Sequence, residues 1–229
     1  MRCMSNVKNL LMAWYMYQED NDGKLVNGNI PQQTNSTQPC WVEPPQDEDG
    51  NFTGSGSPTE EDEIRGIRKG ALFPMAKSID VYRCPSDQRK RNPGNATFRS
   101  YSIAGGMNGE ERNTGWLTGR AIVKYGQIRN NSTKYVFVEE ADPREWNMGS
   151  WVVPPDGDSW YDPVCVWHNG RSALGFADVH VEMHRWEDKR TLEMAKEGAF
   201  NAVHENSVDL KYMQDRYQLK PGNSGRRTK

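Results

Sequence analysis

The chain has few hydrophobic residues and no long apolar run. Only 35% of its 229 residues are hydrophobic, and the mean hydropathy is −0.91. This balance excludes a protein built of apolar membrane spans and is low for a compact enzyme. However, 8 Trp and 9 Tyr argue against disorder, because disordered chains are poor in aromatic residues. With 21 Gly and 13 Pro, the composition predicts one loop-rich globular domain over residues 1–229, with a core of large rings.

An excess of charge of one sign and the common catalytic motifs are also missing. The formal net charge is −2, so no basic field is available for nucleic acid, which is not an expected partner. The sequence contains neither G-x-S-x-G nor a glycine-rich phosphate loop. The adjacent acids Glu139 and Glu140 cannot flank one glycosidic bond, because neighbours on a strand point to opposite faces. The sequence therefore gives only weak signals for an enzyme.

The four cysteines contain no C-x-x-C pair, which argues against a zinc ribbon or a thioredoxin-type motif. They are few and widely spread along the chain: Cys3, Cys40, Cys84 and Cys165. Two long-range disulfides in an oxidising compartment or four separate buried thiols in the cytosol both fit this spacing. The polar, Trp-rich composition favours disulfides, but three pairings stay open.

An amphipathic helix is predicted at the start of the chain. Apolar residues recur there at helical spacing, and Gly23 is a suitable terminator: Met4, Val7, Leu10, Leu11, Trp14 and Tyr17. Met1 and Arg2 are poor N-caps, and the apolar pattern begins at once. We therefore expect the helix to continue into residues that precede Met1. A frayed N-terminus is the alternative.

The remaining elements predict an α+β protein. A long loop over residues 24–57 precedes a short helix, for which Ser57 is a suitable N-cap. The clearest strand is the buried run in residues 134–142, and two helical segments are expected after residue 190. Strands and helices do not alternate regularly, which favours α+β over a doubly wound α/β fold.

The stretch "VWHNGRSALGFADVHVEMHRW" contains three of the four histidines and raises the question of a metal site. On a helix, His180 and His184 could share one zinc ion, but on a strand they lie about 13 Å apart. Apolar residues alternate with polar ones from Val179 onward, which is typical of a half-solvated antiparallel strand. The sequence therefore favours a structural role for these histidines in a hairpin around Asp178.

The sequence suggests two other kinds of ligand site. Carboxylates cluster in a Gly-containing loop at Asp156, Asp158 and Asp162, which could hold calcium, although solvated turns explain them more simply. Four tryptophans lie in predicted loops, where their rings could stack on sugars: Trp116, Trp146, Trp151 and Trp160. Burial is the commoner fate of such rings.

Four motifs, in this order, resemble one known family. They are "RCMSNVKNLLMAWYMYQEDNDGKLV", "VYRCPSD", "HNGRSALGFADVHVEMHRW" and "NSVDLKYMQDR". Prepilin-type proteins of planctomycetes, verrucomicrobia and lentisphaerae have a similar helix and Asp-Asn-Asp-Gly turn, a Cys-Pro-Ser-Asp motif and a C-terminal signature of His, nine residues and Asp-Gly. Here His168 is followed by nine residues and then Asp178. The family's Gly is replaced by Val179, which resists φ > 0, so we expect a turn other than type I′ or a longer loop.

The family is similar to the major pseudopilin of type II secretion, and this resemblance carries several implications. It implies a pilin-like fold, in which residues 1–20 are the C-terminal half of a longer helix and residues 21–229 are the head. It implies a non-enzymatic pseudopilus subunit that is anchored in the inner membrane by an N-terminal segment, with its head in the periplasm, or a protein of the extracytoplasmic surface. Partners would be other pseudopilin subunits, inner-membrane components of the secretion system, and a polysaccharide or secreted cargo.

The resemblance also assigns roles to individual residues. Cys3 and Cys84 belong to two of the shared motifs, so a disulfide between them is expected, which leaves Cys40 to pair with Cys165. Subunits would pack through one face of the helix, formed by Val7, Leu10, Leu11 and Trp14. Some pseudopilins hold calcium in a loop of the head, which strengthens the case for the acidic loops.

Two alternatives remain from the sequence. One is a surface carbohydrate-binding protein that uses the loop tryptophans. The other is a zinc-dependent hydrolase that uses the following residues: His168, Asp178, His180 or His184.

Overall fold

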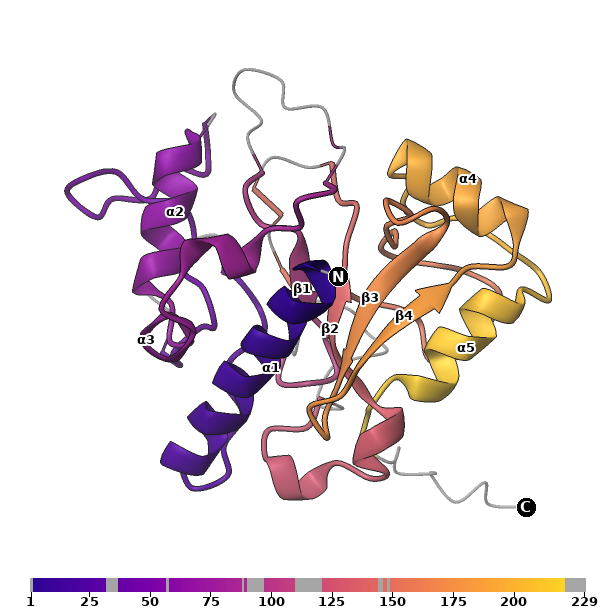
Figure 1. Ribbon diagram of the computed structural model, residues 1–229, viewed down its shortest axis with the longest axis horizontal. Helices are drawn as coiled ribbons and strands as arrows, with labels where there is room; N and C mark the ends of the chain where they lie inside the picture. Colours follow the sequence, from indigo (N-terminus) through magenta and orange to yellow (C-terminus); the bar gives the residue numbers. More distant parts are fainter. Residues whose placement is uncertain are drawn as a thin grey trace, which may run out of the picture.

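A helix, α1 (Arg2–Asp20), lies across a four-stranded antiparallel sheet in the computed structural model, which describes residues 2–31, 37–56, 58–87, 89, 97–109, 121–143, 146–147 and 149–220 (Figure 1). The strand order is β1-β2-β3-β4, with bounds β1 (Tyr101–Ile103), β2 (Tyr135–Glu139), β3 (Arg171–Phe176) and β4 (Val181–Arg185). The mixed α+β class predicted from the sequence is confirmed.

The inner face of α1 is part of the core. Val7, Leu10, Leu11 and Trp14 are all completely buried, as the helical periodicity requires. On β3, a Cβ atom added to Gly175 would lie 2.6 Å from Val7 Cγ1 and 2.8 Å from Leu11 Cδ1. Glycine thus lets the helix approach the sheet closely. These four side chains are therefore not free to contact a neighbouring subunit, and the prediction that they form the assembly face is wrong.

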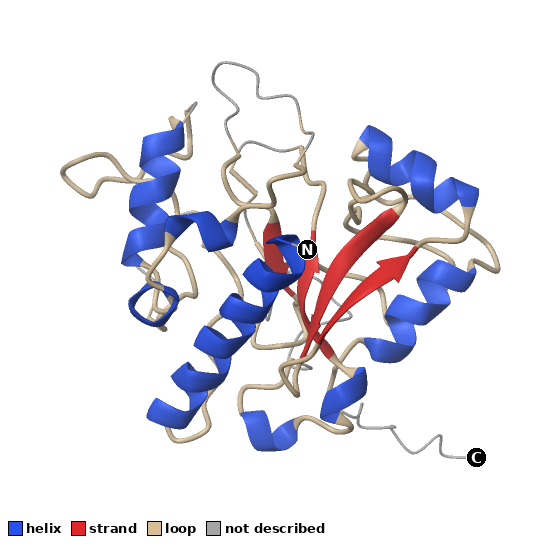
Figure 2. Ribbon diagram, viewed as in Figure 1, coloured by secondary structure: helices blue, strands red, loops and turns tan. Residues whose placement is uncertain are grey.

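The other helices flank the sheet (Figure 2). On one side of it lie α2 (Glu60–Lys69) and α3 (Phe73–Ala76), and on the other α4 (Lys189–Glu197) and α5 (Val208–Arg216). Short 3-10 helices occur at η1 (Ile79–Tyr82), η2 (Tyr125–Gln127) and η3 (Asn131–Thr133). The two predicted C-terminal helical segments are confirmed as α4 and α5. One buried hydrophobic cluster runs from Cys3 to Tyr217.

The start of α2 differs from the prediction. Thr59, not Ser57, is the N-cap: its side chain accepts a hydrogen bond from the Asp62 N–H, and the Asp62 side chain accepts one from the Thr59 N–H. This reciprocal capping box satisfies two N–H groups at once, which a lone serine two residues earlier cannot do. Ser57 itself lies outside the described residues.

The β3–β4 hairpin places a valine in a left-handed backbone conformation. The Val179 N–H donates to Phe176 O at 2.9 Å, and the Phe176 N–H donates to His180 O at 2.9 Å. This is a tight turn followed by a bulge residue, and Val179 has φ +72° at the bulge. The expectation of a turn other than type I′ is thus confirmed, but the expectation that Val would avoid φ > 0 is wrong. The Lys8 ammonium, 2.7 Å from Val179 O, connects the strained turn to α1.

No helix in the described part of the chain is long and apolar enough to span a bilayer.

Candidate functional site

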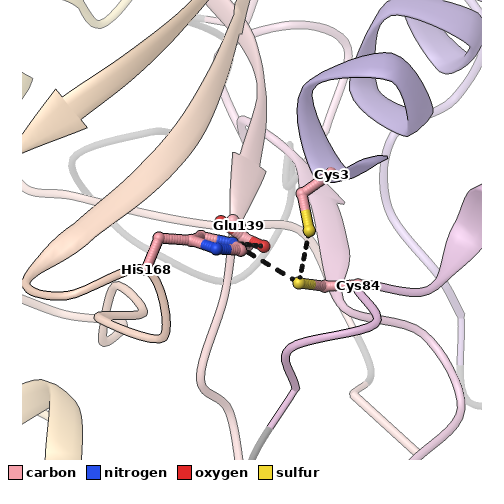
Figure 3. Close-up of side chains that lie close together, drawn as sticks. All are labelled: Cys3, Cys84, Glu139 and His168. Atoms are coloured by element: carbon pink, nitrogen blue, oxygen red, sulfur yellow. Dashed lines mark hydrogen bonds and ion pairs between the residues drawn. The ribbon is translucent and has the colours of Figure 1, made fainter. Parts of the chain in front are cut away.

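Four side chains from distant parts of the chain converge beside the first turn of α1 (Figure 3). Cys3 lies in that first turn, Cys84 follows η1, Glu139 ends β2, and His168 lies in the turn before β3. Cys3, Cys84 and Glu139 are buried, and the His168 side chain is only 16% exposed. The four therefore form one enclosed cluster, here called the thiol cluster.

The polar atoms of the thiol cluster point at one another. The two sulfur atoms are 2.8 Å apart, and Cys84 Sγ lies 3.5 Å from His168 Nε2. The same ring nitrogen is 3.0 Å from Glu139 Oε1. All four donor atoms lie within 4.8 Å of one another. Two sulfurs, one nitrogen and one oxygen thus surround a single point.

Local backbone structure holds Cys84 in place. Asp87 N–H donates to Cys84 O at 3.1 Å, which closes a turn with Pro85 at its second position, where the fixed φ of proline suits the turn. The Ser86 N–H donates to Cys84 Sγ at 3.3 Å, and the Cys84 N–H donates to Ser100 Oγ at 3.0 Å. The Cys-Pro-Ser-Asp sequence therefore aims the sulfur inward and gives it a backbone donor.

Glu139 is fixed by the sheet. Its Oε2 accepts a hydrogen bond from the Ala173 N–H on β3 at 2.8 Å, which leaves Oε1 directed at His168. The next residue, Glu140, accepts instead from Ser102 Oγ on β1. The two neighbouring acids thus have separate surroundings, and the prediction that they point to opposite faces is confirmed.

Contacts within the thiol cluster shift the pKa values of its members. The hydrogen bond with Glu139 raises the pKa of His168, although burial opposes this. The hydrogen bond between the two thiols lowers the pKa of Cys3 to about 6 and raises the pKa of Cys84. Burial and then the Glu139 charge raise the pKa of the neighbouring Cys165 thiol. The cluster therefore favours a thiolate on Cys3, and the contact with Glu139 favours the protonated form of His168.

This geometry does not suit nucleophilic catalysis. A Cys–His nucleophile needs one ring nitrogen on the thiol and the other on an orienting group. Here a single nitrogen, His168 Nε2, faces both Cys84 and Glu139, and Cys84 is completely buried from substrate. Donors that converge on one point are instead the arrangement of a cross-link or a metal centre.

The predicted disulfides stay predictions, although one predicted pair of cysteines is close together. The structure brings Cys3 and Cys84 together, but all four cysteines, each of them described, are thiols. Cys40 has Asn27 and Gln38 as partners, and Cys165 lies beside Glu139. Both are thiols with different neighbours, so the structure gives no support for the predicted pairing of Cys40 with Cys165.

The proposed calcium ligands do not converge. Asp156 and Asp158 are exposed, whereas Asp162 is 2% exposed and accepts the Val152 N–H at 2.7 Å. Among the described residues, the thiol cluster is the one group of three or more ligand side chains. The three aspartates are turn and loop residues, and the calcium assignment to them is wrong.

The predicted sugar-stacking rings are core residues. Trp146, Trp151 and Trp160 are 3%, 0% and 1% exposed, and each indole N–H has a buried acceptor: Gly54 O, Pro163 O and His204 Nδ1 respectively. Rings enclosed in this way cannot stack on a sugar, so this prediction is wrong for all three. Trp116 lies outside the described residues.

The other residues proposed for a hydrolase contact neighbouring side chains. β4 is confirmed as a strand, and it does not hold His180 and His184 toward a common ion. His180 stacks on Phe176 with ring centroids 4.4 Å apart, and Asp178 contacts it in the turn. His184 is covered by the α5 residue Tyr212, with centroids 3.9 Å apart, so this part of the predicted solvated face is packed. Only His168 of the proposed hydrolase residues joins the thiol cluster.

Glu139 is the member of the thiol cluster whose role the sequence did not reveal. It directly follows the apolar run of β2 (Tyr135–Glu139), and a charged residue in such a position is buried only with a partner. The position of Glu139 thus indicates that it needs a buried partner. Which residues these partners are, Cys3, Cys84 and His168, is seen only in the fold.

Comparisons of the chain with protein-family models, curated proteins and solved structures gave no match.

Proposed function

We propose that this protein is a non-enzymatic subunit of a pseudopilus-like filament, in which copies of the chain associate through the outer face of α1. The observation that carries the proposal is the division of α1 into two unlike faces. The inner face is fully buried on the antiparallel sheet, and the outer face exposes Met12 at 46% and Met16 at 45%.

The outer face of α1 has the spacing of a helix-docking stripe. Ser5, Asn9, Met12 and Met16 are all exposed and follow one another at intervals of four, three and four residues. Such positions line one side of a helix, and methionine adapts to irregular partner surfaces. The described residues with large exposed hydrophobic side chains are few: Met12, Met16, Val203 and Val208. Two of these four lie on α1, so we expect subunits to associate through this helix.

The thiol cluster fits this role because it fastens α1 to the head. Cys3 belongs to the helix, while Cys84, Glu139 and His168 belong to the body. A force applied along the helix would pass to the sheet through this contact and through the packing at Gly175. Partners in the proposal are other pseudopilin-like subunits and inner-membrane components of a secretion system, with the head outside the cytoplasm.

Site-specific photo-cross-linking in the cell that makes the protein tests the proposal. A photoreactive phenylalanine analogue at position 12 or 16 is expected to give a ladder at multiples of the subunit mass. The same analogue at Val203, which is 64% exposed and lies far from α1 in sequence, is the matched control and should give no ladder. Adding Met12→Glu to the position-16 protein should remove the ladder, because a charge would enter an apolar contact. Monomers alone from positions 12 and 16 would contradict the proposal.

A further inference from the structure

The thiol cluster has the composition of a metal site. Cysteine sulfur, histidine nitrogen and carboxylate oxygen are the three donor types that zinc takes from proteins. Two sulfurs with one nitrogen and one oxygen suit a tetrahedral, borderline-soft cation better than magnesium or calcium, which prefer oxygen alone.

We propose that the thiol cluster, in its dithiol form, is a structural zinc site whose ligands are Cys3, Cys84, Glu139 and His168. The inference does not rest on the proposed function, because it concerns how the chain is held together rather than what it assembles with.

The distances between donors support this assignment. Zinc bonds of about 2.0–2.3 Å in a tetrahedron place neighbouring donors about 3.3–3.8 Å apart. The contact between Cys84 Sγ and His168 Nε2, at 3.5 Å, lies in that range, and the contact between His168 Nε2 and Glu139 Oε1, at 3.0 Å, is slightly short. The sulfur atoms, 2.8 Å apart, would separate by about 1 Å. Side-chain rotation of Cys3, at the end of α1, can supply this movement.

The surroundings of the donors are those of a closed site. Glu139 Oε2 is held by the Ala173 N–H and Cys84 Sγ by the Ser86 N–H, so two ligands are oriented by backbone groups. Such outer contacts fix metal ligands in place. Three of the four donor residues are buried, and four protein ligands fill a tetrahedron without an open position for substrate. The site is therefore structural rather than catalytic.

Charge gives an independent reason. A buried carboxylate and two buried thiols gather around one point. A divalent cation would neutralise the carboxylate and one thiolate, and zinc binding would release the thiol protons to solvent. Because the ligands come from four separate segments, the binding free energy would become folding free energy.

Metal titration of the reduced full-length chain tests the inference. Native mass spectrometry should show one Zn²⁺ per chain, and Co²⁺ in its place should produce the charge-transfer absorption of two bound thiolates. Cys84→Ser and His168→Ala should weaken Zn²⁺ binding at least 100-fold, and Glu139→Gln at least tenfold. Cys40→Ser is the matched control, since this buried cysteine lies outside the cluster, beside Asn27 and Gln38; the Zn²⁺ affinity of this variant should stay within twofold of wild type.

The cobalt spectrum of the unmodified chain keeps the test decisive if a variant does not fold. Failure of the reduced chain to bind equimolar Zn²⁺ would overturn the inference, as would a cobalt complex without thiolate absorption. So would a zinc-free protein isolated from its cell with Cys3 joined to Cys84, because the cluster would then be the disulfide predicted from the sequence.

Discussion

Trp14→Ala is expected to lower the free energy of unfolding by about 3–5 kcal/mol, because it removes the largest ring on the inner face of α1. Trp14 is completely buried and meets Tyr125 edge-on, with ring centroids 5.9 Å apart. The cavity would lie between the helix and the rest of the core, where the rigid sheet limits collapse. Small domains are stable by only about 5–15 kcal/mol, so much of that stability would be lost. Urea denaturation followed by circular dichroism measures the change.

Two variants make the Trp14 result specific. Trp14→Phe should cost less than Trp14→Ala, because it keeps a ring and removes an indole N–H that has no hydrogen-bond partner among the described residues. Met16→Ala, on the exposed face of the same helix, should change stability by no more than about 0.5 kcal/mol. Equal losses from Trp14→Ala and Met16→Ala would show that α1 is not packed as described.

Glu63→Gln is expected to stabilise the protein at alkaline pH by about 5 kcal/mol relative to the wild type. Glu63, on α2, is 5% exposed; its Oε2 accepts the Phe98 N–H at 2.7 Å, and its Oε1 has no partner in the described structure. Burial raises its pKa to about 8, although that N–H and the charges of Arg99 and Arg89 favour the ionised form. Glutamine keeps the shape and an acceptor for Phe98 without a buried charge.

The sign follows from proton binding. The pKa of Glu63 is higher in the folded chain than the ordinary value of 4.5, so the folded state holds its proton more tightly. The stability that this provides is fully present below pH 4.5 and is lost as the pH rises through 8. The difference between Glu63→Gln and wild type should therefore grow from pH 4.5 to 8 and then level off. Chemical denaturation at several pH values measures it.

The control for Glu63 lies on the same helix. Glu61→Gln removes a solvent-exposed carboxylate and should stay within about 0.5 kcal/mol of wild type at every pH. A difference between Glu63→Gln and wild type that does not change with pH would show that Glu63 is not buried in its charged form.

The spacing of apolar residues predicts several helices and strands of this fold. The buried face of α1, the strand β2 and the helices α4 and α5 follow from apolar spacing, which reports one face of one element at a time. The start of α2 was misplaced by two residues because Ser57 and Thr59 are both good caps, and only the reciprocal bond with Asp62 distinguishes them.

The thiol cluster was only partly visible in the sequence. Cys3 and Cys84 were joined through the motifs that carry the family resemblance, and the fold brings them together. Glu139 and His168 could not be added, because their meeting depends on the register of β2 on β3 and on the turn before β3. The tryptophans show why burial in loops is hard to predict from the sequence. A ring in a predicted loop is expected to be accessible, but Trp151 and Trp160 are buried against Tyr135 and Trp186 respectively.

The thiol cluster is expected to fasten α1 to the sheet, and hydrogen exchange measures this attachment directly. In wild type, the amides of residues 6–11 should exchange as slowly as those of β2. In Cys3→Ser they should exchange at least tenfold faster, while β2 and β3 stay protected. Cys40→Ser, which changes a buried cysteine outside the cluster, should leave α1 unchanged. Exchange in α1 that is equally slow in wild type and Cys3→Ser would contradict this expectation.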